Sequence, residues 1–177
     1  MNKLQGKKIA ILAANGFEQV EMEEPRKALE DEGAETFLIS PEKDEVQGWH
    51  HFEKGDKFPV DVPLNEAKSE NFDALLLPGG VINPDQLRLY PEAAAFVKAL
   101  NEQQKPIAAI CHGPWLLINA ELAKGRKMTS WLSVKTDLIN AGAEWVDEPV
   151  VCDKDILTSR KPADIPKFNE AMIQLFE

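Results

Sequence analysis

Several features that would assign a protein class at once are scarce in this chain. Only two of its 177 residues are cysteines, Cys111 and Cys152, which argues against a disulfide-stabilised scaffold. Neither a Cys-x-x-Cys nor a His-x-x-x-His spacing occurs, so we expect no metal site. No apolar run approaches the ~20 residues that a membrane-spanning helix needs, and we expect no membrane association.

Positive charge is also in short supply. The chain has 20 lysines and arginines against 30 aspartates and glutamates, for a formal net charge of −10. Because no basic patch is available to neutralise phosphates, we expect no nucleic-acid partner. The polar start of the chain, residues 1–8, and the short apolar stretch behind it lack the features of a secretion signal, which predicts a cytoplasmic protein.

What remains is an ordinary globular composition, 44% hydrophobic and 28% charged, in which strand-like and helix-like patterns alternate. The alternation predicts one α/β domain over residues 1–177, a three-layer sandwich with a mostly parallel central sheet. The expected strands are 9–14, 36–39, 74–77, 107–110, 128–131, 145–151 and 155–158, with a hairpin over 46–62. The expected helices are 17–32, 91–104, 115–122, 134–140 and 165–176.

The hexapeptide Ala-Ile-Cys-His-Gly-Pro at residues 109–114 joins an expected strand to an expected helix. A cysteine on such an elbow lies near helix N–H groups, which favour a thiolate and a developing oxyanion. Gly113 permits close approach, and proline suits a first helical position. Alternatively, Cys111 is a small core residue. The flanking histidine, glycine and proline suit a turn, however, and favour a nucleophile on an elbow.

Two other loops also follow expected strands, residues 15–18 and 79–85. In a parallel sheet the ligand crevice lies at the carboxyl ends of the strands. We therefore expect these loops and the segment 111–114 to meet at one site.

The same loops carry a family likeness. The chain resembles the PfpI family, the intracellular cysteine peptidase branch of the DJ/PfpI superfamily, over about residues 8–175. The resemblance implies a flavodoxin-like, class I glutamine amidotransferase-like fold. The matching stretches are Asn-Gly-Phe-Glu at 15–18 with Glu21, Leu-Leu-Leu-Pro-Gly-Gly at 75–80, Pro-Asp-Gln-Leu-Arg at 84–88, 105–114, 125–127, 140–145 and 158–160.

The resemblance also implies roles for individual residues. Cys111 is the expected nucleophile and His112 its partner. Asp85 matches an acidic residue that reaches the histidine from a neighbouring subunit, which implies a homo-oligomer, a dimer or a hexamer. Glu18 matches a carboxylic acid beside the sulfur. The glycines expected to bind substrate or an oxyanion are Gly79, Gly80 and Gly113.

Local chemistry leaves alternatives open at several of these positions. His112 is alternatively a solvent-facing residue without a role. Glu18 is alternatively a helix-end carboxylate, as we interpret the glutamates at 21, 23 and 24. Asp85 is alternatively a helix cap. Four further residues lie outside the expected site. We interpret Cys152, His50 and His51 as structural, and Arg160 as either a loop residue or a subunit contact.

Two functions fit this site. The first is a cysteine hydrolase without a cofactor, acting on a small carbonyl or peptide substrate. The resemblance implies peptidase, deglycase or glyoxalase-like chemistry in stress defence. The second is a non-catalytic stress protein, a redox sensor or chaperone, in which Cys111 is oxidised. A true glutamine amidotransferase is nearly excluded, because no histidine follows His112 to act as its downstream base.

Overall fold

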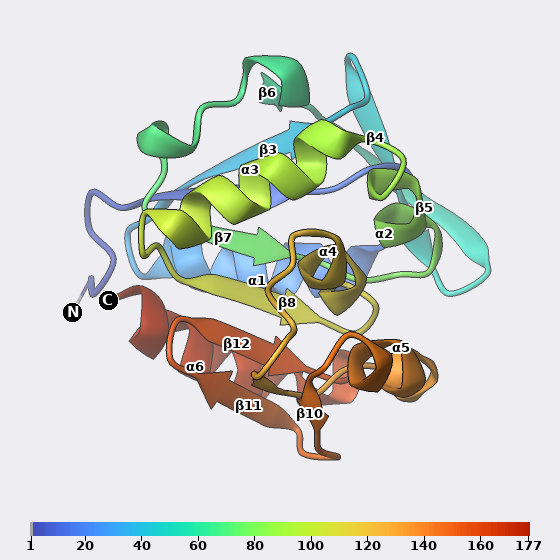
Figure 1. Ribbon diagram of the computed structural model, residues 1–177. Coiled ribbons are helices and arrows are strands. Elements are labelled where there is room, and N and C mark those ends of the chain that lie inside the picture. Colours follow the sequence, from blue (N-terminus) through green and yellow to red (C-terminus); the bar gives the residue numbers. More distant parts are fainter. Residues whose placement is uncertain (1) are drawn as a thin grey trace.

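The computed structural model describes residues 2–177 and contains a seven-stranded sheet with helices on both faces (Figure 1). The strand order is β11-β12-β8-β7-β1-β3-β6, and every neighbouring pair is parallel except β11 with β12. The strands are β1 (Lys8–Leu12), β3 (Glu35–Ser40), β6 (Val62–Pro63), β7 (Ala74–Leu77), β8 (Ile107–Ile110), β11 (Val150–Asp153) and β12 (Ile156–Ser159).

The central strands are apolar along their whole length because both of their faces are covered. All four residues of β7, β8 and β12 are buried. Helices α1 (Gln19–Asp31) and α6 (Ile165–Phe176) pack on one face and on each other. Helices α3 (Pro91–Glu102), α4 (Pro114–Asn119) and α5 (Lys135–Asn140) pack on the other. The predicted three-layer α/β sandwich is confirmed.

The predicted strand over residues 145–151 is wrong. Two short strands replace it, because the acidic pair 147–148 and Pro149 interrupt the pattern. They are β10 (Glu144–Trp145), which pairs with β9 (Lys127–Met128), and β11 at the edge of the main sheet. Side chains alternate along β11, so that Val151 is buried and Cys152 is exposed. Cys152 is therefore an exposed edge-strand residue.

A second, three-stranded sheet stands beside the carboxyl ends of the main strands. It is formed by β2 (Phe17–Glu18) and by the predicted hairpin of β4 (Glu45–His50) and β5 (Glu53–Pro59). Helix α2 (Ile82–Leu87), which follows the Pro-Gly-Gly loop, is absent from the expected helices, and Asp85 lies inside it rather than at its N-cap. The remaining elements are the 3-10 turns η1 (Leu64–Glu66), η2 (Ser69–Asn71), η3 (Leu132–Val134) and η4 (Pro162–Asp164).

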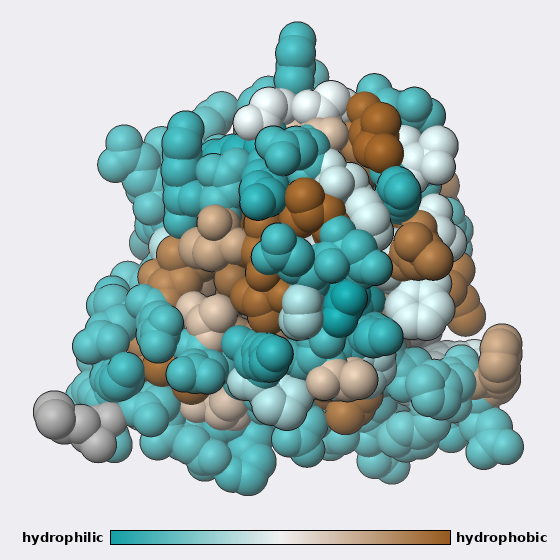
Figure 2. All heavy atoms as spheres, turned by 90° about the horizontal axis from the view of Figure 1, so that it is seen from below, coloured by the Kyte–Doolittle hydropathy of each residue, from teal (hydrophilic) through white to brown (hydrophobic). Residues whose placement is uncertain are grey.

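Figure 2 shows the side of the molecule that faces downward in Figure 1, where β10 and β11 lie. Hydrophilic side chains cover most of this side, and hydrophobic atoms lie between them near the centre and along the right-hand side of the view. Within residues 2–177 we find no helix that combines the length and the apolar character needed to span a membrane.

Candidate active site

The three strand-end loops meet, as the parallel sheet predicts, around one cavity of about 660 Å³. Cys111 and His112 from the elbow, Gly16 from the first loop and Gly80 from the second all border it. Three further polar residues line it, Glu18, Glu21 and His51. The rest of its wall is apolar, contributed by Trp49, Phe52, Val81, Ile82, Trp131 and Pro162. An apolar cavity with a few convergent polar groups is typical of a small-molecule site.

Cys111 occupies a strained backbone conformation at the end of β8. Its φ of 64° lies in the left-handed region that residues with a side chain seldom adopt. The peptide on each side is anchored: the Cys111 N–H donates to Ser159 O at 3.0 Å, and the Trp131 N–H donates to Cys111 O at 2.9 Å. At Gly113 a Cβ atom would approach Leu77 O to 2.6 Å, so the turn requires glycine. The predicted elbow is therefore present.

His112 lies beside the sulfur and is enclosed. Its Nδ1 is 3.3 Å from Cys111 Sγ, and its Nε2 is 3.3 Å from Ser133 Oγ. The imidazole also packs edge-on against Trp115 and stacks near Trp131. Only 5% of the residue is exposed, and burial lowers its pKa from 6.5 to about 4. The imidazole is therefore neutral at neutral pH and is not a solvent-facing bystander.

The carboxyl group beside the sulfur belongs to Glu21 and not to Glu18. Helix α1 starts at Gln19, so Glu21 is in its first turn, fully buried, and within reach of the Cys111 thiol. A Cβ atom at Gly79 would overlap both the Glu21 carboxyl and the Cys111 Cβ. Glu18 instead caps the hairpin turn: its carboxylate accepts a hydrogen bond from the His51 N–H at 3.1 Å.

Glu21 is electrostatically unusual. Neither carboxyl oxygen makes a hydrogen bond of ordinary geometry with any of residues 2–177. Burial raises the pKa of Glu21 from 4.5 to about 8, and the nearby Cys111 thiol and the N–H groups of Gly79 and Gly80 offset this only partly. Below pH 8 the group is therefore a neutral acid that can donate a proton or a hydrogen bond.

The sulfur environment differs from the acidic thiol that the elbow alone suggests. Burial raises the pKa of Cys111 above its ordinary value, and a charge on Glu21 raises it further. The N–H groups of Gly80 and His112 act in the opposite direction, because they point at the sulfur and favour the thiolate. Burial is the larger influence, since only 7% of Cys111 is exposed.

The three expected glycines have different positions. Gly80 has a φ of 78° and borders the cavity with its N–H near the sulfur, which suits an oxyanion donor. The Gly79 N–H lies near the Glu21 carboxyl, as the Gly80 N–H also does. The Gly113 N–H is already bound to Ile110 O at 2.9 Å and is not free to bind an oxyanion. Gly113 shapes the elbow, and Gly80 and His112 provide the N–H groups at the sulfur.

Asp85 is exposed on α2 and makes no hydrogen bond or ion pair with His112 within the part of the chain that is described. Two residues earlier, Asn83 is fully buried; no sequence pattern identified it as part of the site. Asn83 accepts from the Ala14 N–H at 2.7 Å and donates to the carbonyls of Pro78 and Gly79 at 3.0 Å each. This side chain thereby ties two of the strand-end loops together.

The other residues left open by the sequence also have defined surroundings. The exposed His51 ring is 3.7 Å from the Glu18 carboxylate, at the tip of the β4–β5 hairpin. Arg160 pairs within the chain with Asp147 at 2.7 Å and Asp164 at 2.9 Å. Arg160 therefore secures the loop that precedes α6.

Comparison with known proteins identifies the family. The model of the DJ-1/PfpI family matches residues 7–175. General stress protein 18 of Bacillus subtilis is 45% identical over 175 residues, covering 97% of this chain and 99% of that protein. An uncharacterized protein of Staphylococcus aureus (strain Mu50) is 46% identical over 171 residues, covering 95% and 97%.

Similar solved structures also carry DJ-1 or PfpI names. A protein of Anabaena variabilis with DJ-1/ThiJ/PfpI-like and ferritin-like domains has a TM-score of 0.88 and 34% identity, covering 95% of this chain and 49% of that longer chain. Drosophila melanogaster DJ-1beta has a TM-score of 0.86 and 25% identity, covering 95% and 89%. With a strained cysteine elbow, a buried acid beside it and a family match along nearly its whole length, this chain belongs to the DJ-1/PfpI family.

Proposed function

We propose that the protein is a cysteine-dependent hydrolase of the PfpI type that attacks the carbonyl carbon of a small carbonyl or peptide substrate. The observation that carries the proposal is the position of Cys111. Its sulfur sits on a strained elbow, 3.3 Å from an imidazole nitrogen, at the wall of a largely apolar cavity. Strain of this kind concentrates at functional sites, because the surrounding fold must hold it in place.

The proposed chemistry needs no preformed thiolate. His112 is neutral, so Nδ1 can accept the thiol proton as the sulfur bonds to the carbonyl carbon. This requires the hydrogen of the imidazole to be on Nε2, where Ser133 Oγ can accept it. The N–H groups of Gly80 and His112 then stabilise the oxyanion. The leaving group takes the proton from the imidazolium, and water hydrolyses the acyl-enzyme.

The proposal includes completion of the site by a second subunit. His112 contacts a hydroxyl but no carboxylate among residues 2–177, whereas Asp85 is exposed and available to a neighbour. A carboxylate supplied by the neighbour would stabilise the imidazolium that forms during the reaction.

The decisive experiment compares wild type with Cys111→Ser, using methylglyoxal-treated thiols and unstructured peptides as substrates. Cys152→Ser is the matched control, because Cys152 is exposed on an edge strand away from the cavity. We expect wild type and Cys152→Ser to release product and Cys111→Ser to be inactive. Equal turnover by Cys111→Ser would refute the hydrolase.

A second candidate is a redox-sensing stress protein in which Cys111 is oxidised rather than turned over. It is favoured by the neutral Glu21 carboxyl, which can donate a hydrogen bond to a sulfinate oxygen. The name of the Bacillus subtilis relative, General stress protein 18, is compatible with such a role. Intact mass spectra after graded peroxide test it: a stable sulfinate on Cys111 without substrate turnover would favour the sensor.

A further inference from the structure

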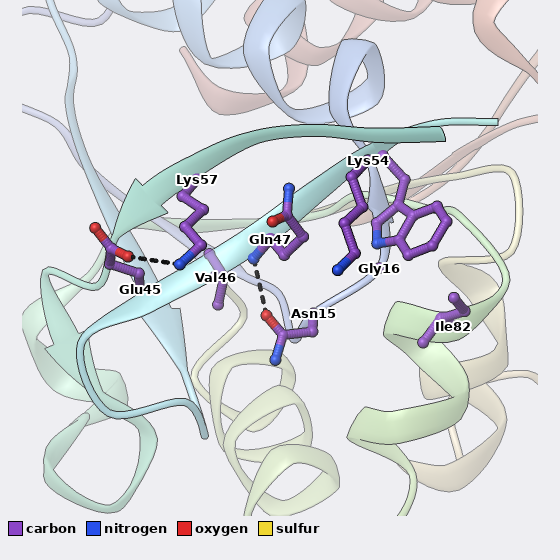
Figure 3. A pocket seen from close by; sticks show the side chains of 9 residues that line it. Asn15, Gly16, Glu45, Val46, Gln47, Lys54, Lys57 and Ile82 are labelled. Carbon is purple, nitrogen blue, oxygen red and sulfur yellow. Dashed lines mark hydrogen bonds and ion pairs between the residues drawn. The ribbon is translucent and has the colours of Figure 1, made fainter. Parts of the chain in front are cut away.

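Figure 3 shows a second hollow, of about 410 Å³, which borders the cysteine cavity through shared lining residues. The two spaces have three lining residues in common, Gly16, Trp49 and Ile82. Gly16 packs closely against Ile82 at this boundary, because a Cβ atom on Gly16 would overlap the Ile82 side chain. A ligand that reached from Cys111 into the second hollow would run along Trp49 and Ile82, which line both spaces.

The second hollow carries an uncompensated positive charge. Two lysines of β5 line it. Lys57 is neutralised by Glu45, whose carboxylate is 3.3 Å from the ammonium group. Lys54 makes no ion pair with any of residues 2–177, and Figure 3 shows its side chain reaching into the hollow. In a chain of net charge −10, such an ammonium group is a local attractor for an anion.

The cysteine cavity has the opposite character. Its acidic lining groups are the carboxylate of Glu18, 3.7 Å from the exposed His51 ring, and the carboxyl of Glu21, which is neutral below pH 8; most of its other walls are apolar. Val81 is 56% exposed and Trp131 40%, so these hydrophobic surfaces are available to a ligand. An anionic group is disfavoured there, whereas an aromatic or aliphatic group gains from burial.

We propose that the two hollows form one extended groove that selects substrates with an apolar side chain at the reacting carbonyl and a carboxylate on the leaving side, held by Lys54. This inference rests on the proposed hydrolase function and names its substrate class. In a short acidic peptide, the apolar residue would lie against Trp131 and Val81. The following residue would then cross Ile82 and place its carboxylate at Lys54.

The reaction on such a peptide is ordinary acyl transfer. The Cys111 sulfur bonds to the carbonyl carbon of the apolar residue, and the C–N bond to the following residue breaks. The departing amine takes the proton that left the thiol. Water then cleaves the thioester, which releases the acid and restores the thiol.

Binding can be tested without turnover. N-acetylphenylalanylglycine, its C-terminal amide and N-acetylglycylglycine are titrated by calorimetry into Cys111→Ser, which binds without cleaving. We expect the phenylalanyl acid to bind roughly fivefold to tenfold more tightly than its amide, and more tightly than the glycyl acid. The preference for the acid should shrink in 0.5 M NaCl, since salt screens the charge.

Variants assign the preference to Lys54. Adding Lys54→Met should abolish the difference between acid and amide, and Lys54→Arg should keep it. The double substitution Glu45→Gln with Lys57→Met, which removes the neutralised ion pair, should also keep it. N-acetylphenylalanylglutamic acid α-amide, whose only free carboxylate is in the side chain, then distinguishes the two sources of a carboxylate. Tight binding of this ligand places the carboxylate in a side chain, and weak binding places it at the C-terminus of the peptide.

Binding and hydrolysis are measured separately, so the extended groove and the proposed hydrolase activity can fail independently. Equal binding of acid and amide, or no binding of either, overturns the extended groove even if Cys111-dependent hydrolysis is observed. A Lys54-dependent preference without hydrolysis of the phenylalanyl peptide by wild type supports the groove and counts against the hydrolase.

Discussion

The carboxyl group of Glu21 and the sulfur of Cys111 share one enclosed space beneath Gly79, and burial raises the pKa of both. Two neighbouring groups that both become anionic on losing a proton cannot ionise independently. Whichever loses its proton first makes the second ionisation harder. The pH dependence of this protein should therefore reflect the pair.

The stability of wild type should fall as the pH rises from about 4.5 to about 8. In this window the unfolded chain has an ionised Glu21, whereas the folded chain keeps it protonated up to a pKa of about 8. Folding then takes up a proton, so the free energy of unfolding decreases with pH, by an amount on the order of 5 kcal/mol at most. Melting temperatures of wild type and Glu21→Gln should converge near pH 5 and diverge by pH 8, with Glu21→Gln the more stable. Glu18→Gln is the control, and parallel curves for wild type and Glu21→Gln would contradict the expectation.

The reactivity of Cys111 should respond to the same substitution at alkaline pH. Above pH 8 the ionised Glu21 of wild type opposes formation of the thiolate, and Glu21→Gln removes this repulsion. In a Cys152→Ser background, iodoacetamide should alkylate Cys111 several-fold faster in Glu21→Gln than in wild type at pH 9. Below pH 7 the two rates should be similar. A uniform rate ratio across the pH range would show that the carboxyl acts only by its shape.

Ser133 should act as a positioning residue for His112. Its Oγ is 3.3 Å from Nε2, and an Nε2–H donated to it leaves Nδ1 free to accept the thiol proton. Ser133→Ala should lower kcat roughly threefold to tenfold with little change in KM, and Ser133→Thr should restore much of the loss. The ¹⁵N shifts of the imidazole report the tautomer independently of activity. An unchanged Nε2–H tautomer in Ser133→Ala would rule out this role.

Asp85 should complement Cys111 across a subunit interface if the site is shared between subunits. Cys111→Ser and Asp85→Ala are each expected to be inactive or nearly so. After subunit exchange, mixed oligomers should regain part of the wild-type activity, because some sites then contain an intact cysteine and an intact aspartate. Exchange is verified by native mass spectrometry, and no recovery after verified exchange would reject the shared site.

Asn83 should be among the most sensitive positions for stability. Its side chain is fully buried and bonds to three backbone groups of two loops. Asn83→Leu leaves these groups unpaired and should lower the free energy of unfolding, measured by urea denaturation, by about 2–4 kcal/mol. Asn119→Ala, which removes an exposed hydrogen bond to Arg88, should cost less than about 1 kcal/mol. Equal losses for the two variants would argue against this interpretation.

Much of the fold follows from periodicity in the sequence. Buried strands such as β7 and β8 are short, wholly apolar and bounded by turn residues, so they stand out from the amphipathic helices. The elbow at Cys111 is also visible, because histidine, glycine and proline rarely follow an apolar strand unless the chain turns sharply. These features depend on neighbours in the sequence.

The acid at the sulfur could not be assigned in this way. Four glutamates occur between residues 18 and 24, and only the starting point of α1 decides which one faces inward. Because β2 extends through Glu18, helix α1 begins at Gln19. This start places Glu21 in the core, while Glu23 and Glu24 are exposed. Ser133 gave no signal at all, since its role depends on a loop 21 residues away from His112.

The two hydrogen bonds that hold the strained peptides of Cys111 come from Trp131 and Ser159, 20 and 48 residues farther along the chain. Such distant partners can act only after long loops have closed, and loop closure is slow compared with formation of local structure. During refolding, the helical signal should therefore recover before the elbow is locked. A ribosome-bound or truncated chain that lacks β12 would contain the cysteine and its histidine without the geometry that makes them a site.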